Sequence, residues 1–180
     1  MGKELDLLAK YPKARRDPMA RAREKTAEDI VIARQFGKEF FDGDRRYGYG
    51  GYTYSSERWR GVVTDIVKEY GPVLSVLDVG CAKGHMLQEM AIVLPNLRVV
   101  GIDVSEYAVG CREHNVVLHV GNARNLSRFH DKEFDLVVSI NTVHNLARHG
   151  CIHALEEIER VGKRAYITVD TYRNPAERKR

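Results

Sequence analysis

Apolar residues along the chain follow two periods, and the change falls near residue 71. Before it they recur at helical spacing, most clearly from Trp59 to Tyr70, and Gly71-Pro72 ends that helix. After it, short continuous apolar runs predict five buried strands, at residues 73–79, 97–102, 116–120, 134–140 and 165–169. Helices are expected between them, at about residues 87–94, 105–113 and 152–161. This alternation predicts an α/β fold, a doubly wound, mostly parallel sheet of about five strands.

The first 70 residues are expected to form a helical N-terminal cap that includes a loop. Asp17-Pro18 reads as an N-cap followed by a first-turn proline, and the helical region runs to about Phe41. Thr26 fits either the cap of a second helix or a position inside the first. Residues 42–52 are predicted to be a loop, because four glycines fall within nine residues. Residues 71–180 would form the core, and both parts one structural domain.

The tyrosines of this loop alternate with glycines, so their rings project from a pliable backbone. Aromatic faces suit a cation or a flat ring, and glycines suit a segment that closes over a ligand. We therefore expect a lid in which Tyr49 and Tyr52 contact a bound ligand, with Arg45 and Arg46 available to an anionic group. The alternative is an arm packed statically over the sheet.

Length and composition restrict the class of protein. The 180 residues, 43% apolar and 30% charged, fit one ordered globular domain. No run of 18 apolar residues exists for a membrane span, and the first residues lack the apolar stretch of a signal peptide. Three widely separated cysteines fit reduced thiols, so we expect a cytoplasmic protein without a disulfide framework or a metal site.

The net charge of +4 comes from the N-terminal third of the chain. Residues 1–60 hold 14 Lys and Arg against 10 Asp and Glu, whereas the remainder is balanced. Such an excess could serve an anionic substrate, a nucleic acid or an acidic partner. Because acidic residues are interleaved with the basic ones, a solvated surface of mixed charge is the favoured interpretation.

Small or polar residues follow each predicted strand at its carboxyl end. Gly80 and Gly84 follow the first strand and would let the backbone turn sharply beside a ligand. The helix after Gly84 would offer free N–H groups to an anion. Asp103 ends the second strand, 23 residues after Gly80, where an acid accepts hydrogen bonds from both ribose hydroxyls. We therefore expect a nucleoside-binding crevice at this edge of the sheet.

The kind of nucleoside is indicated by Asp78 and by the glycine spacing. A dinucleotide fingerprint reads G-x-G-x-x-G, whereas Ala82 stands here at the second glycine position. The carboxylate of Asp78, two residues before Gly80, would repel a pyrophosphate and suits a cationic ligand. S-adenosylmethionine carries a sulfonium and an ammonium group, so we favour it over NAD.

The segment from Leu77 to Gly84, LDVGCAKG, resembles the first motif of class I S-adenosylmethionine-dependent methyltransferases. Asp103 resembles their second motif, residues 121–123 their adenine-contacting turn, and residues 134–139 their fourth-strand motif. The four motifs occur in order over about residues 73–170. The resemblance implies a Rossmann-like methyltransferase domain with S-adenosylmethionine as cofactor.

The resemblance also implies roles for single residues. Asp78 would hold the ammonium group of the cofactor, and Asp103 its ribose hydroxyls. Cys81 is expected to pack beside the cofactor rather than to act as a nucleophile. The other residues expected to contact the cofactor are Gly80, Gly84, Val104, Asn122, Ala123, Asn141, Tyr49 and Tyr52. Lys83 and His85, which flank the first motif, are expected to be solvated or to lie at the rim of the substrate site.

Two departures from the family pattern carry expectations of their own. Ala82 replaces a glycine, and its methyl group is expected to narrow the loop. The family fold has seven strands, whereas this sequence ends about ten residues after the fifth predicted strand. We therefore expect either a shortened chain or a homodimer in which a second copy covers the open sheet edge.

His144, just beyond the fourth strand, and Asp170, after the fifth, are the candidate general bases. A packing or helix-start residue is the alternative for His144, and a strand-end cap for Asp170. We expect in-line methyl transfer to an oxygen or nitrogen of a small molecule, with S-adenosylhomocysteine as product. Two other classes stay open: a cofactor-binding pseudoenzyme or partner subunit without turnover, and an RNA methyltransferase that uses the basic arm.

Overall fold

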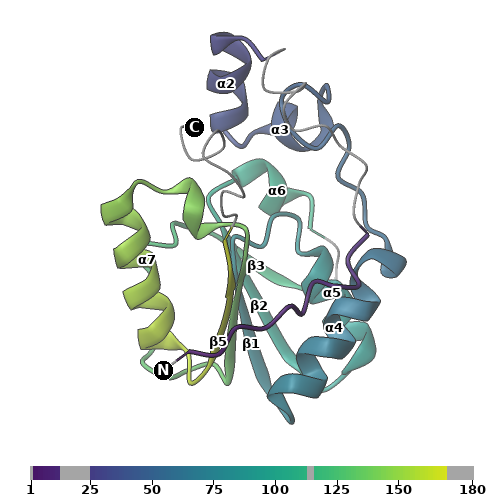
Figure 1. The fold of residues 1–180 in the computed structure, drawn as a ribbon, viewed down its shortest axis with the longest axis vertical. Helices are drawn as coiled ribbons and strands as arrows, with labels where there is room; N and C mark the ends of the chain where they lie inside the picture. The colour runs from purple at the N-terminus through teal and green to yellow at the C-terminus, as the bar shows by residue number, and fades with distance from the viewer. Residues whose placement is uncertain (1, 13–24, 113–115, 170–180) are drawn as a thin grey trace.

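The structure is a computed structural model that describes residues 2–12, 25–112 and 116–169. At its centre lies a five-stranded sheet in the order β3-β2-β1-β4-β5, in which every neighbouring pair is parallel. The strands are β1 (Ser75–Val79), β2 (Arg98–Asp103), β3 (Val117–Val120), β4 (Leu136–Ile140) and β5 (Ala165–Thr168). The prediction of a doubly wound α/β sheet of about five strands is confirmed (Figure 1).

Helices cover both faces of the sheet. The helices α4 (Ser56–Tyr70) and α5 (His85–Val93) lie on one face, and α7 (Arg148–Val161) lies on the other (Figure 1). Successive side chains of a strand point to opposite faces, so neighbours in β1 join different cores. Val76 packs in the cluster that contains α4 and α5, and Leu77 packs in the one that contains α7. This arrangement buries the strands on both sides, which explains their continuous apolar sequence.

The N-terminal segment crosses the face that α4 and α5 cover (Figure 1). Leu7 is buried in the same cluster as Trp59 and Ile66 of α4. Its backbone N–H donates to the hydroxyl of Tyr166 in β5 over 3.3 Å. The beginning of the described chain is therefore attached to the last strand.

A small helical cap lies beyond the carboxyl ends of the strands, at the top of Figure 1. It consists of α2 (Ala27–Arg34) and α3 (Lys38–Asp42), and it faces α6 (Glu106–Gly110), the helix that follows β2. The hydroxyl of Ser105, which caps α6, donates to the carbonyl of Phe36 between α2 and α3 over 2.5 Å. The cap is thus joined to the edge of the sheet that parallel α/β folds use for ligands.

The cap region contains two short helices separated by a break. Phe36 adopts a left-handed conformation (φ +50°), and Gly37 begins α3. Thr26 caps α2, since its hydroxyl accepts from the N–H of Asp29 while the Asp29 carboxylate accepts from the N–H of Thr26. A helix therefore begins after Thr26, as one of the two expectations for this residue had it. The N-cap expected at Asp17-Pro18 lies outside the described residues.

The glycine- and tyrosine-rich segment after α3 is a loop, as predicted. It folds back along α3, because the N–H groups of Tyr49 and Gly51 donate to the carbonyls of Phe40 (2.8 Å) and Phe41 (3.0 Å). A Cβ atom on Gly48 would lie 2.0 Å from the Phe40 carbonyl oxygen, so the close approach requires glycine there. The loop is consequently fixed by backbone contacts to the cap.

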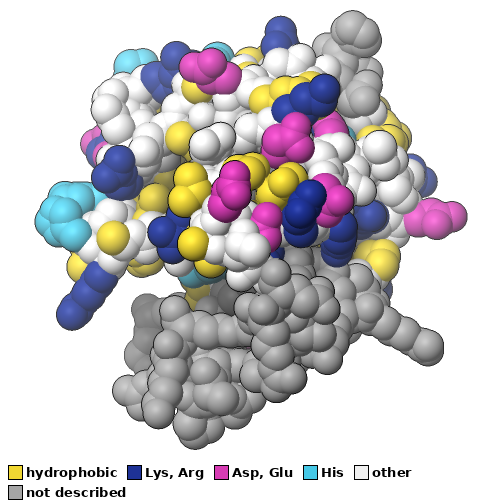
Figure 2. Space-filling model, turned by 90° about the horizontal axis from the view of Figure 1, so that it is seen from above, with side chains coloured by type: hydrophobic (Ala, Val, Ile, Leu, Met, Phe, Trp, Pro, Cys, Tyr) yellow, Lys and Arg dark blue, Asp and Glu magenta, His cyan; other side chains and the backbone are white. Residues whose placement is uncertain are grey.

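Charges of both signs are interspersed on the described surface at the cap end of the molecule (Figure 2). Five of the basic residues in the N-terminal third fall within residues 13–24, outside the described part of the chain. Within residues 2–12, 25–112 and 116–169, no helix combines the length and the apolar character that crossing a membrane requires.

Candidate functional site

The turn after β1 brings the backbone to the carboxyl edge of the sheet. Gly80 (φ +85°) and Gly84 (φ +76°) are left-handed, and so is Ala82 (φ +51°) between them. A Cβ atom on Gly80 would lie 2.0 Å from Oγ1 of Thr142, so only glycine fits at this point. The N–H of Ala82 donates to Oδ2 of Asp103 over 2.8 Å, which joins the turn to the end of β2.

Asp103 keeps hydrogen-bonding capacity beyond its backbone contacts. Its Oδ1 accepts from the N–H of Ser105 over 2.8 Å, and its Oδ2 accepts from Ala82. Burial raises the pKa of Asp103, and these backbone N–H groups offset part of the rise. Each carboxylate oxygen has two lone pairs, so both can accept a further hydrogen bond from a ligand. The side chain is thus placed to receive a pair of hydroxyl groups.

A cavity of about 330 Å³, here called the cap cavity, opens beside Asp103. Gly80 and Val104, which follow β1 and β2, line it on the side of the sheet. On the side of the cap it is lined by aromatic rings. Among these, Phe40 packs edge-on against Phe36 (5.1 Å between centroids) and Tyr49 (5.3 Å). The turn after β3 adds Asn122 and Ala123 to the wall. The cap cavity therefore combines an acidic end with a flat, apolar roof.

A second cavity of about 360 Å³, here called the Trp59 cavity, lies between the N-terminal segment, the tyrosine loop, α4 and the ends of β1 and β4. His144 lines it from the 3-10 helix η1 (Val143–Asn145), which follows β4. Gly80, Ala82 and Asn141 line both cavities. The two cavities therefore meet at the turn after β1 and form one crevice.

Asp78 supplies a buried carboxyl group to the Trp59 cavity. The residue is 5% exposed, and no described group donates a hydrogen bond to its side chain. Burial, and next the charge of Asp103, raise the pKa of Asp78 to about 8. The free domain therefore holds this carboxyl protonated near neutral pH, and a cation brought beside it would favour the ionised form.

Residues 76–165 match the protein family described as "Methyltransferase domain". The chain belongs to this methyltransferase family. The expectation of a class I S-adenosylmethionine-dependent methyltransferase domain with a Rossmann-like fold is therefore confirmed. Among curated proteins, none matches the chain significantly.

Several solved structures share this fold, and each is longer than the part of it that matches this methyltransferase domain. The PH0226 protein of Pyrococcus horikoshii OT3 is 27% identical with a TM-score of 0.55, over 73% of this chain and 63% of that one. The plantazolicin methyltransferase BpumL, solved in complex with a monoazolic desmethylPZN analog and S-adenosylhomocysteine, is 26% identical with a TM-score of 0.51, over 57% of this chain and 43% of that one. A putative S-adenosylmethionine-dependent methyltransferase of Methanococcus maripaludis shares the fold at 19% identity (TM-score 0.54, over 66% and 57%). The chain spans roughly half the length of such structures.

The structure gathers most of the predicted site residues around the crevice of the methyltransferase domain. The cap cavity holds Asp103, Val104, Asn122 and Ala123, the Trp59 cavity holds Asp78, Cys81, Tyr52 and His144, and both hold Tyr49, Gly80 and Asn141. Gly84 lines neither cavity, since it precedes α5 and faces Leu118 and Val116. Asp170 lies outside the described residues.

Cys81 packs against β2 beside the crevice. A Cβ atom on Gly101 would lie 2.6 Å from its sulfur, so the thiol fills the space that the glycine leaves. Burial raises the pKa of the Cys81 thiol well above its usual range. A thiol in this environment stays protonated, which fits a packing role.

Lys83 and His85 are buried, and the expectation that they are solvated or lie at a rim is corrected. Lys83 is 8% exposed, and its Nζ lies 2.6 Å from Oδ2 and 2.8 Å from Oδ1 of Asp42 at the end of α3. His85 is 3% exposed and stacks on Tyr52, with ring centroids 4.7 Å apart. Both side chains attach the loop and the cap to the turn after β1.

Sequence reasoning did not find the aromatic roof of the crevice. The segment up to about Phe41 was expected to be helical, and Trp59 was expected on the apolar face of the helix that ends at Gly71-Pro72. The available signal was Gly37, because a glycine inside a helical pattern favours a break. That break turns the three phenylalanines toward one another and over the crevice.

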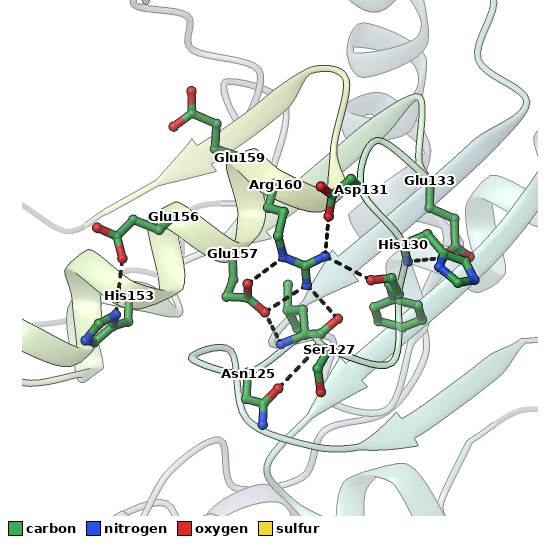
Figure 3. Close-up of polar contacts among 12 residues, drawn as sticks. Asn125, Ser127, His130, Asp131, Glu133, His153, Glu156, Glu157, Glu159 and Arg160 are labelled. Atoms are coloured by element: carbon green, nitrogen blue, oxygen red, sulfur yellow. Dashed lines mark hydrogen bonds and ion pairs between the residues drawn. The ribbon is translucent and has the colours of Figure 1, made fainter.

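Arg160 on α7 fixes the loop that follows β3 (Figure 3). Its guanidinium donates to the carbonyls of Leu126 (3.0 Å) and Phe129 (3.0 Å) and pairs with Asp131 (2.8 Å) and Glu157 (2.7 Å). The same loop begins with the turn that contains Asn122 and Ala123. A helix on the opposite face from α4 therefore positions one wall of the cap cavity.

Two histidines on α7 lie one helical turn apart, whereas the sequence was expected to contain no two histidines at metal-ligand spacing. His149 and His153 are one turn apart, with their Nε2 atoms 2.9 Å from each other, and Nδ1 of His153 contacts Glu156 (Figure 3). No set of three or more metal-binding side chains occurs in the described part of the chain.

Proposed function

We propose that this domain binds S-adenosylmethionine along the two cavities and transfers its methyl group to a small molecule. One observation carries the proposal: the cavities meet at Gly80, with Asp103 on one side and Asp78 on the other. Asp103 can accept hydrogen bonds from two hydroxyl groups, and Asp78 offers a buried carboxyl group nearby. This arrangement fits a ligand in which a ribose is attached to a cationic amino acid.

The cap cavity would hold the adenosine part of the cofactor. Asp103 would accept hydrogen bonds from the ribose hydroxyls through its remaining lone pairs. Asn122 and Ala123 would lie beside the adenine ring, and the aromatic roof would cover it. BpumL, a neighbour at 26% identity, is described with S-adenosylhomocysteine bound, which supports this choice of ligand.

The Trp59 cavity would hold the amino-acid end and the acceptor. Asp78 would pair with the ammonium group, whereas a pyrophosphate would meet a buried carboxyl group at the same place, which disfavours NAD. The ring faces of Tyr49 and Tyr52 are suited to a sulfonium. Residues 8–11 close this cavity from the N-terminal side, so a small acceptor fits better than a folded polymer.

His144 would act as the general base. The bound cofactor supplies an electrophilic methyl group on a sulfonium. The acceptor oxygen or nitrogen would take this methyl group, and the sulfur would leave with the electron pair of the C–S bond as S-adenosylhomocysteine. The proton of the acceptor passes to the imidazole of His144 and then to water. The remaining contribution of the protein is to hold both partners in line.

Calorimetric titration with S-adenosylhomocysteine tests the proposal. We expect the chain to bind S-adenosylhomocysteine and not NAD. Asp103→Ala removes two charge-assisted hydrogen bonds, so its affinity should fall by about a hundredfold. Glu159→Ala, which changes an exposed acid on α7 that lines neither cavity, is the matched control and should retain the wild-type affinity.

Two results would contradict the proposal. One is the absence of S-adenosylhomocysteine binding to a folded wild-type chain. The other is equal affinity in Asp103→Ala and the wild type, because the ribose would then lie elsewhere.

A further inference from the structure

The walls of the Trp59 cavity are aromatic. Tyr11 packs edge-on against Trp59, with ring centroids 5.0 Å apart. Tyr49 and Tyr52 lie on the tyrosine loop with centroids 4.5 Å apart. Leu8 and Met86 add aliphatic surface between these rings. Walls of this kind favour a flat, apolar molecule over a polar one of equal size.

One wall of the cavity carries the hydroxyl group of a tyrosine whose side chain is largely buried. Tyr52 is 7% exposed, and its backbone N–H donates to Asp42. Its hydroxyl makes no hydrogen bond to any residue that the structure describes. Burial raises the pKa of Tyr52, so the group remains a neutral phenol and a donor. A hydroxyl group on a cavity wall that has no partner among the described residues can donate to an atom of a bound ligand.

The charges around the cavity further restrict what binds. Asp78 provides its carboxyl group, and no lysine or arginine lines it within residues 2–12, 25–112 and 116–169. Arg58, which precedes Trp59 on α4, does not line the cavity, although its positive charge acts to lower the pKa of Tyr52. A carboxylate or phosphate on the acceptor would lose its hydration here without gaining a lysine or arginine partner, which weakens its binding relative to an uncharged acceptor.

We propose that the Trp59 cavity selects an uncharged aromatic acceptor, a phenol or an aromatic amine, whose reacting group contacts the Tyr52 hydroxyl. This inference rests on the proposed function, because the acceptor must lie beside the end of the cofactor that Asp78 marks. Tyr52 would bind the acceptor atom through a hydrogen bond, and His144 on the same cavity would receive its proton.

Trp59 itself reports on the cavity, since it is the only tryptophan of the chain. Binding of 4-methylphenol is measured by Trp59 emission and by calorimetry, with and without saturating S-adenosylhomocysteine. Benzoate and glucose serve as the charged and the polar comparison. We expect 4-methylphenol to change the emission in both states, and benzoate to bind at least about tenfold more weakly. Glucose should leave the emission unchanged.

The contribution of the hydroxyl is isolated by Tyr52→Phe, which keeps the ring. This variant should bind 4-methylphenol about fivefold more weakly, as expected for one lost hydrogen bond. Toluene, which has no hydroxyl, should bind Tyr52→Phe and the wild type equally. Tyr47→Phe is the matched control, because Tyr47 lies on the same loop and lines neither cavity.

The possible failures can be told apart. Binding of benzoate or glucose that equals or exceeds that of 4-methylphenol would overturn the acceptor class, whether or not S-adenosylhomocysteine binds. Equal affinity of Tyr52→Phe and the wild type for 4-methylphenol would overturn the contact with the hydroxyl. Loss of S-adenosylhomocysteine binding alone would overturn the proposed function.

Discussion

Lys83 and Asp42 form an ion pair that joins the turn after β1 to the end of α3, with Nζ 2.6 Å from Oδ2. The hydroxyl of Tyr107 on α6 donates to the same carboxylate over 2.6 Å. Burial raises the pKa of Asp42, but the hydrogen bonds from Lys83, Tyr107 and the Tyr52 N–H outweigh it and hold that pKa at about 2. One carboxylate thus connects the cap, the turn after β1 and α6.

Removing this pair should loosen the roof of the cap cavity. Lys83→Met leaves Asp42 with a weaker set of partners, and we expect about tenfold weaker binding of S-adenosylhomocysteine. Calorimetry measures the affinity, and hydrogen exchange of residues 38–52 measures the loosening. Lys3→Met, which breaks an exposed pair with Glu69, should change neither. Unchanged affinity in Lys83→Met would show that the pair does not support the site.

Binding of the cofactor should release a proton from Asp78. Because the pKa of Asp78 is raised to about 8 in the free domain, this group favours the folded state below pH 4 and loses that contribution as pH rises through 8. An ammonium group beside it restores the ionised form. The affinity for S-adenosylhomocysteine should therefore rise from pH 6 to pH 8.

Calorimetry in two buffers of different ionisation enthalpy measures this proton directly. The wild type should release close to one proton per ligand at pH 7, and Asp78→Asn should release none from this position. Glu159→Gln provides the exposed control. A wild-type proton release that persists in Asp78→Asn would assign the titration to another group.

His85 should make the domain sensitive to acid. Burial, then the charges of Lys83 and Arg58, lower the pKa of His85 to about 4. Its neutral form therefore stabilises the fold above pH 6.5, and that contribution is lost as pH falls toward 4. His85→Phe keeps a ring against Tyr52 and removes the titration. Between pH 7 and pH 4, the free energy of unfolding obtained from thermal melts should fall by about 2 kcal/mol less in His85→Phe than in the wild type. Parallel losses in both proteins would contradict this.

Gly80→Ala should remove the site. The added methyl group would meet the Thr142 side chain at 2.0 Å, and the left-handed backbone at Gly80 disfavours any side chain. We expect a loss of about 3 kcal/mol in the free energy of unfolding, together with loss of S-adenosylhomocysteine binding. Gly110→Ala, where a Cβ atom meets nothing within 4 Å, is the control. Chemical denaturation and calorimetry test both variants, and full binding by Gly80→Ala would show that the turn can adjust.

The sheet could be predicted because its signals are local. Five apolar runs mark the strands, and Gly80, Ala82 and Asp103 mark the turn and the strand end. The arrangement of the cap could not be predicted, because it depends on contacts between residues that are far apart in the sequence. Phe36 is held by Ser105, and Lys83 is buried because Asp42 reaches it from α3. No property of Lys83 or of its neighbours in sequence distinguishes such a lysine from a solvated one.

The attachment of Leu7 to Tyr166 has a consequence for the order of events during synthesis. Leu8 and Tyr11, which complete the Trp59 cavity, belong to the first of the described segments. The strand on which their neighbour Leu7 docks is translated last among the described elements. Contacts between such distant positions form only after the intervening chain is in place. The wall of the crevice that Leu8 and Tyr11 supply therefore forms only after β5 has been synthesised.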